Sequence, residues 1–391
     1  MPPARLAALL VAVSGLSGVV GGVVGARVAD SPESTTVVLD RPSDPAPTTA
    51  ATTGLRSGFD PAAIYARRSP GVVTVYAALP GGETQGSGFV VSSAGTILTN
   101  AHVITDVADV GEQDPVRGAD AVYVEFRDGE RVKAKIAGWD LFNDVGVIRV
   151  DPGDHPVVPV PLGDSDRVRV GTPVAAIGSP FGKQTSLAVG VVSATGRTID
   201  SLTSGFSIAD AIQVDAPINR GNSGGPLFDA RGRVIGITAQ IQSASGTAEG
   251  VSFVVPIDIA VRALREISER GKVEYAYLGI ETQDVTPGVA RALGLPATRG
   301  ALVTAIIPGG PAARAHIESG TSVRRVNGID VTVGGDIIVG IGAFPVRSSG
   351  DIGRVVGRSL RPGQKVAVTV VGQAGRRSVE VTLGTRPGRP T

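Results

Sequence analysis

The sequence predicts a mostly-β chain in which two small β-barrels are followed by a separate α+β module. Between Gly71 and about Val255, short apolar runs alternate with Gly, Pro, Asp and Ser at the spacing of barrel or sandwich strands. There are about ten such runs, more than one small closed barrel needs, so two barrels are expected. Residues 273–388 mix strand-like and helix-like segments over the length of an ordinary domain.

The first 29 residues predict a transmembrane anchor or a signal peptide. Leu6–Ala26 holds 21 residues without a charge, between Arg5 and Arg27. A helix of that length spans a bilayer and is long for a signal-peptide core, so an anchor is favoured. Val24-Gly25-Ala26 is an acceptable cleavage site, which keeps the signal peptide as the alternative. Either way we expect the rest of the chain outside the cytoplasm, held by a single membrane span or secreted.

Residues 30–58 predict a flexible linker, because Pro, Ser, Thr and Ala dominate and large apolar residues are few. We expect the first folded domain over 59–272, starting with a short helix at Ala62–Arg67. Its last element should be a helix capped by Asp258 and ended by Gly271. The apolar stripe of that helix consists of Val261, Leu264 and Ile267.

The second domain, 273–388, is expected to hold strands at YLGIET, GALVTAII, KVAVTVV and SVEVTL. Helices are expected at Pro311–Ile317 and Ser349–Arg358.

Composition excludes several functions. Lys+Arg 37 against Asp+Glu 36 leaves a formal net charge of +1, with no basic cluster interleaved with aromatics, so nucleic acid is a poor partner. There is no cysteine, which removes thiol catalysis and thiolate metal sites. The three histidines lie far apart in sequence, so neither a metal nor another cofactor is expected.

The stretch NRGNSGGPLF places Ser223 among glycines and predicts either a plain turn or a nucleophile loop. A serine hydroxyl needs a base to take its proton, and the base needs a third group to orient it. His155 lies in a proline-flanked loop and His316 in the second module. His102 ends an apolar strand in TILTNAHVI, which makes it the best candidate for the base.

Asp144 is the candidate that orients His102, because it directly precedes the apolar strand Val145–Val150. Asp140 is its rival. The order His102, Asp144, Ser223 would put the first two residues in one barrel and the serine in the other, with the site between them. Gly221 would let its own N–H and that of Ser223 face one developing oxyanion.

The motifs TNAHV, DVGVIRV and GNSGGPL resemble the signatures of the HtrA/Deg family of chymotrypsin-fold serine proteases. The similarity covers about residues 64–383, since the second module looks like the PDZ domain of that family. It implies a serine endopeptidase with His102 as general base, Asp144 as its partner and Ser223 as nucleophile. It also implies an oxyanion hole formed by Gly221 and Ser223. Asp144 matches the family pattern better than Asp140.

Two positions near the nucleophile refine this expectation. Asn222 stands where relatives activated by clipping have an Asp, so that activation switch is expected to be absent. The residue six positions before the nucleophile, where trypsin-like enzymes hold a selecting Asp, is Pro217, flanked by Ala216 and Ile218. We therefore expect small to medium apolar residues at the cleaved position.

PDZ domains bind a C-terminal carboxylate with backbone N–H groups and add the peptide as a strand. Tyr277, Leu278, Gly279 and Ile280 match the carboxylate loop of the family, and PGGPAARA resembles its helix entry. His316 and an extra stretch at Val323–Val333 depart from the common pattern. An unrelated β-rich packing module is the alternative.

The resemblance also implies partners. These are unfolded or specific envelope proteins as substrates, C-terminal peptides at the PDZ domain, and a homotrimer formed through aromatics near the start of the protease domain. Phe59 and Tyr65 could serve there, or could pack locally. A PDZ-dependent chaperone or scaffold and a dedicated signalling protease remain alternatives to general protein quality control.

Overall fold

The computed structural model describes residues 58–388 except 112–113, 180–184, 202, 205, 220 and 240–250. The expected anchor at Leu6–Ala26 and all but the last residue of the linker lie outside the described residues. Within the described part of the chain, no helix is long and apolar enough to cross a membrane.

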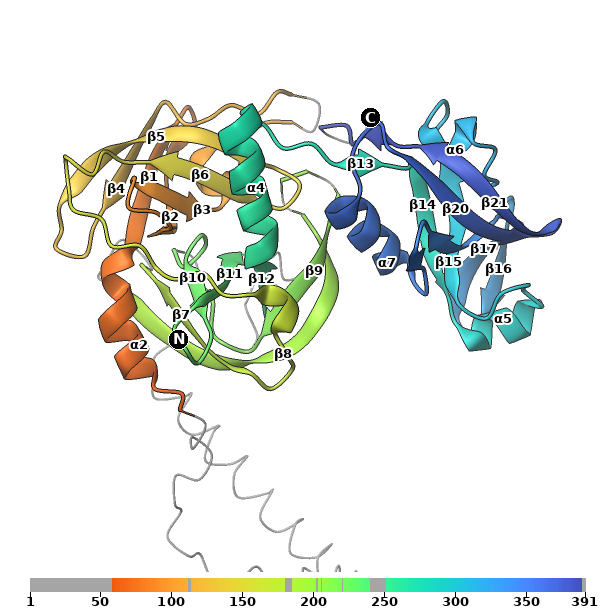
Figure 1. The fold of residues 1–391 in the computed structure, drawn as a ribbon, viewed down its shortest axis with the longest axis horizontal. Helices are drawn as coiled ribbons and strands as arrows, with labels where there is room; N and C mark the ends of the chain where they lie inside the picture. The colour runs from red at the N-terminus through yellow and green to blue at the C-terminus, as the bar shows by residue number, and fades with distance from the viewer. Residues whose placement is uncertain are drawn as a thin grey trace, which may run out of the picture. The chain divides into compact units, whose positions relative to one another are not determined.

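Six antiparallel strands close the first barrel in the order β1-β2-β3-β6-β5-β4 (Figure 1). Side chains alternate across its wall, so that in β4 Val122 and Val124 are buried while Tyr123 is exposed. The strands are β1 (Val72–Leu79), β2 (Gly82–Val90), β3 (Thr96–Thr99), β4 (Ala121–Glu125), β5 (Arg131–Asp140) and β6 (Val145–Arg149).

The second barrel repeats this arrangement in the order β10-β11-β12-β9-β8-β7. Its strands are β7 (Pro173–Gly178), β8 (Ser186–Asp200), β9 (Ser207–Val214), β10 (Pro226–Phe228), β11 (Val234–Ala239) and β12 (Ser252–Pro256). The expectation of two barrels is confirmed, with six strands in each. The expected figure of about ten omits β5, in which Arg131, Lys133 and Lys135 interrupt the apolar residues, and β10, which is only three residues long.

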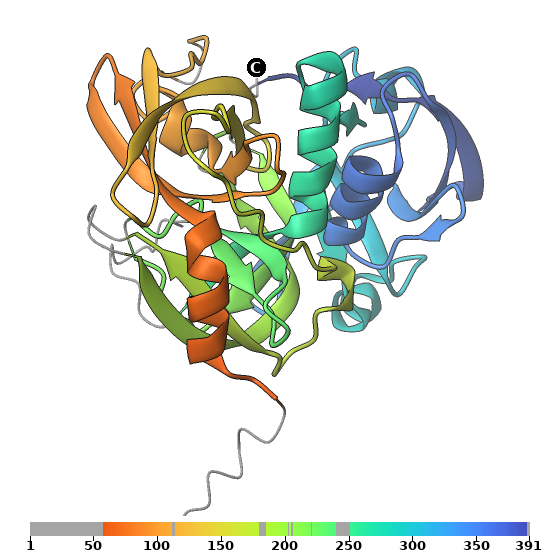
Figure 2. The same ribbon diagram turned by 60° about the vertical axis from the view of Figure 1, so that its left-hand side comes forward.

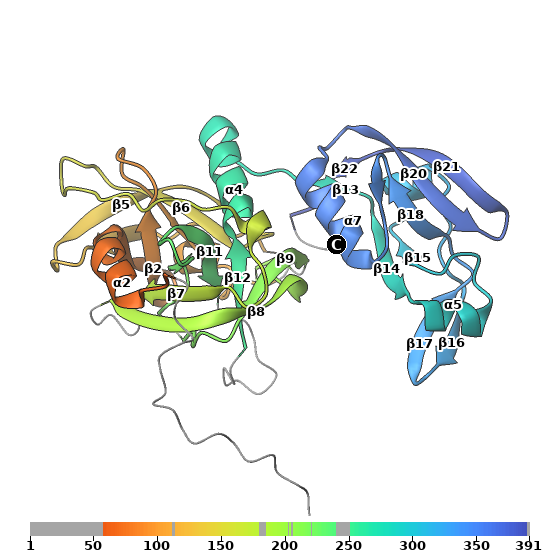
Figure 3. The same ribbon diagram turned by 60° about the horizontal axis from the view of Figure 1, so that its bottom comes forward.

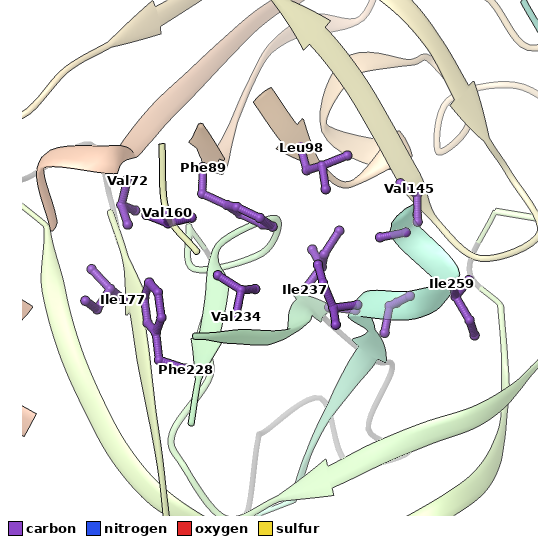
Figure 4. Close-up of a cluster of buried hydrophobic side chains, with 14 of the residues drawn as sticks. Val72, Phe89, Leu98, Val145, Val160, Ile177, Phe228, Val234, Ile237 and Ile259 are labelled. Carbon is purple, nitrogen blue, oxygen red and sulfur yellow. The ribbon is translucent and has the colours of Figure 1, made fainter. Parts of the chain in front are cut away.

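Every residue of β3, β10 and β11 is buried, as expected of strands that are packed on both faces. These strands contribute to one apolar cluster that draws side chains from both barrels. Figure 4 shows Phe89 and Leu98 of the first barrel on one side and Phe228, Val234 and Ile237 of the second on the other. We call this cluster the inter-barrel core.

Helix α2 (Pro61–Arg68) forms where the short helix was expected, with the Asp60 side chain accepting the Ala63 N–H as its cap. It runs along the second barrel, where Ile64 and Phe59 join the inter-barrel core (Figure 2).

Helix α4 (Ile257–Arg270) ends at Gly271 as expected, in a left-handed conformation. Ile267 is buried in the inter-barrel core, and Val261 and Leu264 pack against it. The expectation that Asp258 caps α4 is wrong. Pro256 is the N-cap residue, because β12 runs directly into the helix. Asp258 lies in the first turn, where its Oδ2 accepts the N–H of Ser165 at 2.8 Å.

The C-terminal module has its own core and a sheet in the order β14-β15-β18-β20-β21, with β19 paired to β18 (Figure 3). These strands are β14 (Ile280–Val285), β15 (Gly300–Ile306), β18 (Ile337–Ile341), β19 (Phe344–Pro345), β20 (Lys365–Gly372) and β21 (Gly375–Thr382). Before the sheet, β13 (Ala276–Tyr277) pairs with β22 (Gly384–Thr385).

Both helices expected in this module are present but shorter. They are α6 (Pro311–Arg314) and α7 (Ser349–Arg354), the latter continued by a π-helical turn at Val355–Ser359. Sequence reasoning missed α5 (Pro287–Leu293), which Thr286 caps. The extra stretch at Val323–Val333 is a hairpin of β16 (Ser322–Val326) and β17 (Ile329–Val333).

Candidate active site

His102 and Asp144 are brought together by the pairing of β3 with β6. His102 lies on α3 (Ala101–Ile104), a short helix that follows β3, and Asp144 directly precedes β6. The imidazole Nδ1 lies 2.7 Å from Asp144 Oδ2, and the His102 backbone N–H donates to Oδ1 at 3.0 Å. With Nδ1 facing the carboxylate, Nε2 is the nitrogen left to act as a base.

Asp144 is itself held in an unusual conformation. Its φ is +53°, a left-handed region that Asp tolerates better than most residues. Asn100 Nδ2 donates to its carbonyl oxygen at 2.7 Å, which fixes the peptide that leads into β6. The carboxylate retains only 4% of its side-chain exposure, against 22% for His102. The pair therefore lies at the edge of the buried region, with the imidazole on the open side.

The surroundings raise the pKa of His102 above its ordinary value of 6.5. Loss of hydration is the largest single influence and lowers the pKa of the imidazole. The charge of Asp144 and its hydrogen bond act in the opposite direction and together outweigh that loss. Asp144 thus favours the imidazolium form that a general base passes through.

Ser223 lies on the loop that leads into β10 and is 3% exposed. The loop is fixed through its backbone: the N–H of Gly224 donates to Thr238 O at 2.8 Å, and the N–H of Thr238 donates to Gly225 O at 2.9 Å. Among the described residues, none makes a hydrogen bond with Ser223 Oγ. The structure joins His102 to Asp144 but records no bond from Ser223 to His102.

The nucleophile loop packs closely against the segment that carries His102. A Cβ added to Gly224 would lie 2.5 Å from Thr99 Oγ1 and 3.1 Å from the backbone N of Asn100. Only glycine allows an approach this close. The loop with Ser223 and the segment with His102 are therefore neighbours across the boundary between the barrels.

Gly221 and Ser223, the candidate oxyanion donors, are separated by Asn222. Gly221 has φ of +94°, which favours glycine. The carbonyl of Asn222 accepts hydrogen bonds from Thr238 Oγ1 at 2.5 Å and Gly225 N–H at 2.9 Å. Since a peptide is planar and trans, the N–H of Ser223 points away from those donors. The oxyanion role of the two N–H groups stays a prediction.

Asn222 is buried, and its Oδ1 lacks a hydrogen-bond partner among the described residues. An Asp at this position would bury a charge with no partner, which is costly. The uncharged amide is therefore consistent with the expected absence of a charge-based activation switch.

The three residues expected to shape the specificity pocket lie directly after β9. Ala216 and Ile218 are buried in the core of the second barrel, and Pro217 is exposed. Ser252 Oγ donates to Ala216 O at 3.0 Å and accepts the Ile218 N–H at 3.4 Å. The adjacent acid, Asp215, accepts the N–H of Val191 at 2.6 Å. Their contact with substrate stays a prediction.

Asp140, the rival of Asp144, lies at the start of the same turn with a different set of partners. It is 2% exposed and accepts from the Phe142 N–H at 2.9 Å, Asn143 Nδ2 at 2.9 Å and the Tyr275 hydroxyl at 2.6 Å. Burial raises its pKa against the opposing effect of these hydrogen bonds. Asp140 thus organises the turn that presents Asp144. Sequence reasoning gave it no such role.

The other two histidines have different environments. His155 Nε2 lies 2.9 Å from Asp128 Oδ2, and its ring stacks on Phe126 with centroids 3.9 Å apart. His316 has φ of +55° and lies in the C-terminal module.

In the C-terminal module, β14 begins at Ile280, as expected for a strand that would receive a peptide. Gly279 has φ of +73°, so the loop before β14 turns where glycine permits it. The expected carboxylate loop, Tyr277 to Ile280, lines a cavity of about 470 Å³ that Ile352 of α7 and Ala209 of β9 also line.

Comparison with known proteins gives the class first. Residues 86–237 match the model of the trypsin-like peptidase domain, and residues 276–383 match that of the PDZ domain. Two closed barrels with a His–Asp pair and a glycine-bounded serine, followed by a PDZ domain, define a trypsin-like protein with a peptide-binding module.

Similar proteins narrow this class to one family. The chain is 37% identical over 305 residues to a probable periplasmic serine endoprotease DegP-like of Pseudomonas putida (strain W619), covering 78% of this chain and 57% of the relative. The chain thus spans little more than half the length of such relatives.

The solved structure of the HtrA-type protease AlgW with tripeptide superposes with a TM-score of 0.69 at 33% identity, covering 85% of this chain and 98% of that one. The serine endoprotease from Yersinia pestis gives a TM-score of 0.60 at 27% identity over 84% of this chain and 98% of that one. The chain belongs to the HtrA family of serine proteases.

We predict that hydrolysis has an acidic limb above pH 6.5, because only neutral His102 can accept a proton and Asp144 raises its pKa. The measurement is kcat/KM on a peptide substrate from about pH 5 to about pH 9.

Asp144→Asn should lower kcat on the order of 10⁴-fold. It should also move the limb to lower pH, because burial then acts alone. Asp128→Asn, which removes the partner of His155, is the control and should leave the limb in place. A limb below pH 6.5 in the unaltered protein would contradict the prediction.

Proposed function

We propose that this chain is a serine endopeptidase of the HtrA type that cleaves envelope proteins through an acyl-enzyme. The observation that carries the proposal is the two-point contact of Asp144 with His102, beside the close-packed nucleophile loop. A carboxylate that orients a histidine in this way is the arrangement that activates a serine hydroxyl. The names of the DegP-like and AlgW relatives support the same activity.

In the proposed reaction, His102 Nε2 takes the Ser223 Oγ proton as Oγ attacks the peptide carbonyl. The N–H groups of Gly221 and Ser223 stabilise the oxyanion, and the imidazolium gives its proton to the leaving amine. Water then attacks the acyl group on Ser223, again with His102 as base, and releases the second product.

Substrate range is a separate part of the proposal. We infer a role in protein quality control under stress, with unfolded envelope proteins as substrates. The family resemblance supports it, and a dedicated signalling protease is the other possibility. Comparing cells with unaltered protein and with Ser223→Ala distinguishes them: many stabilised proteins support quality control, and one supports signalling.

Ser223→Ala should abolish hydrolysis of unfolded casein and labelling by a fluorophosphonate, because both reactions need the Oγ nucleophile. Ser69→Ala, which alters a buried serine outside the candidate site, should still be labelled. Casein hydrolysis that persists in purified Ser223→Ala would remove the basis of the proposal.

Specificity is proposed to favour small to medium apolar residues at the cleaved position, because Ala216, Pro217 and Ile218 offer no negative charge to an Arg or Lys side chain. Matched peptides with Val, Ala or Arg at that position should give kcat/KM values at least about tenfold higher for Val and Ala than for Arg. A faster reaction with Arg would show that another residue supplies the charge.

We propose the domain layout 59–272 for the protease and 273–388 for the PDZ domain, with peptide binding at Tyr277 to Ile280. A peptide with a free apolar C-terminus should bind in fluorescence anisotropy, and its C-terminal amide should bind at least about tenfold more weakly, since backbone N–H groups recognise the carboxylate. Equal binding of the two peptides would contradict the assignment of the loop.

An anchor at Leu6–Ala26 and extracytoplasmic location are also proposed. The uncharged length of that segment and the periplasmic relatives support them. A homotrimer rests on family resemblance. Phe59 is buried within the single chain, while Tyr65 is part-buried with its hydroxyl bonded to Thr185 O at 2.7 Å. Carbonate extraction of membranes tests the anchor, and analytical ultracentrifugation of residues 59–391 tests the trimer.

A further inference from the structure

Ser87 on β2 is a fully buried residue that none of the motifs single out. Its hydroxyl donates to the carbonyl of Gly221 at 2.6 Å and accepts the N–H of Ser179 at 2.9 Å. Its backbone N–H donates to the carbonyl of Ser223 at 2.7 Å. Its own carbonyl accepts the hydroxyl of Thr99 at 2.7 Å. The side chain and the backbone of Ser87 are thus both hydrogen-bonded inside the protein.

These partners belong to three segments that the reaction must align. Gly221 and Ser223 are the two candidate oxyanion donors, Thr99 ends the strand before His102, and Ser179 follows β7 of the second barrel. Ser87 belongs to the first barrel, so it links that barrel to the nucleophile loop of the other at two carbonyl groups.

Close packing leaves little freedom around Ser87. A Cβ added to Gly86 would lie 3.1 Å from Ser223 O, and a Cβ added to Gly224 would lie 2.2 Å from Ser87 O. Either substitution would have to push β2 and the nucleophile loop apart. The contact between β2 and the nucleophile loop therefore consists of Gly86 on one side and Gly224 on the other, with the Ser87 hydroxyl between them.

Holding these carbonyls restricts where the oxyanion donors can point. The carbonyl of Gly221 belongs to the peptide that joins Gly221 to Asn222, and the carbonyl of Ser223 belongs to the peptide after the nucleophile. Because each peptide is planar, holding the Gly221 oxygen limits ψ of Gly221 and φ of Asn222, and holding the Ser223 oxygen limits ψ of Ser223. The N–H of Gly221 belongs to the peptide before the held one and the N–H of Ser223 to the peptide after it, so the held peptide joins the two donors. The carbonyl of Asn222 between them is held by Thr238 Oγ1. Without the Ser87 hydroxyl, the Gly221 peptide loses its only hydroxyl donor among the described residues and can rotate about the glycine.

We propose that Ser87 is a positioning residue: its hydroxyl holds the Gly221 peptide and so keeps the N–H groups of Gly221 and Ser223 directed at the oxyanion. This inference rests on the proposed peptidase function. Because Ser87 is fully buried, we expect it to act through the loop, and to change stabilisation of the transition state rather than substrate binding.

The test is Ser87→Ala in the full chain. We expect kcat to fall about 10- to 100-fold with KM within about twofold, less than the loss from removing an oxyanion donor outright. The affinity for a peptide boronate should fall by the same factor as kcat/KM, because the boronate reproduces the tetrahedral state. The acidic limb of the pH profile should stay where it is, because His102 and Asp144 are unchanged.

Ser69→Ala is the matched control, since Ser69 is equally buried, in the turn that leads into β1, but bonds to Arg127 and not to the loop. It should leave kcat within about twofold of the unaltered protein. Ser87→Cys keeps a weak donor in nearly the same volume, so its kcat should lie between those of Ser87→Ala and the unaltered protein. It also replaces Ser87→Ala if that variant does not fold.

Three results would overturn the inference: an unchanged kcat in Ser87→Ala, a loss confined to KM, or an equal loss in Ser69→Ala. Failure of the proposed function is distinguishable, because the unaltered protein would then neither cleave casein nor react with a fluorophosphonate. That result would overturn both proposals together.

Discussion

The apolar contact between the two barrels is the constraint on which the site depends. Phe89 follows Ser87 by two residues on β2, and Phe228 lies at the end of the strand after Ser223. Both are fully buried in the inter-barrel core. A close-packed core resists small displacements, so it fixes the distance between the segment with His102 and the loop with Ser223. Neither barrel holds the whole arrangement, and only their contact brings it together.

Two buried carboxylates share one turn and behave differently because their neighbours differ. Asp140 is met by neutral donors, Asn143 and Tyr275, and burial raises its pKa. Asp144 is met by an imidazole that becomes cationic during the proposed reaction. The first carboxylate shapes the turn and the second compensates a developing charge. Since Tyr275 lies between the end of α4 and β13, the shape of this turn also depends on the segment that joins the two domains.

Much of the fold and the candidate triad could be predicted because both rest on local signals. Apolar runs punctuated by turn residues predicted the barrels, and three spaced motifs predicted His102, Asp144 and Ser223. The cap at Asp258 failed because β12 runs directly into α4, which places Asp258 inside the first turn of the helix. The hairpin after Val323 was missed although Asn327-Gly328 is a turn signal, with φ of +50° and +82°. Ser87 gave no signal, since its partners lie in three other segments and a serine between glycines resembles a turn.

Hydrogen-bonded hydroxyls surround the nucleophile loop where an apolar core would be expected. Ser87, Thr99 and Thr238 are all buried, and each donates to a backbone carbonyl near Ser223. Apolar side chains of similar size could fill the same space, but they would remove the hydroxyl donors that hold those carbonyls. Dispersion contacts have little direction, whereas a hydroxyl fixes the plane of the peptide it meets. The inter-barrel core therefore sets the distance between the two barrels, and the hydroxyls set the orientation of the peptides in the nucleophile loop. The proposed oxyanion site needs both.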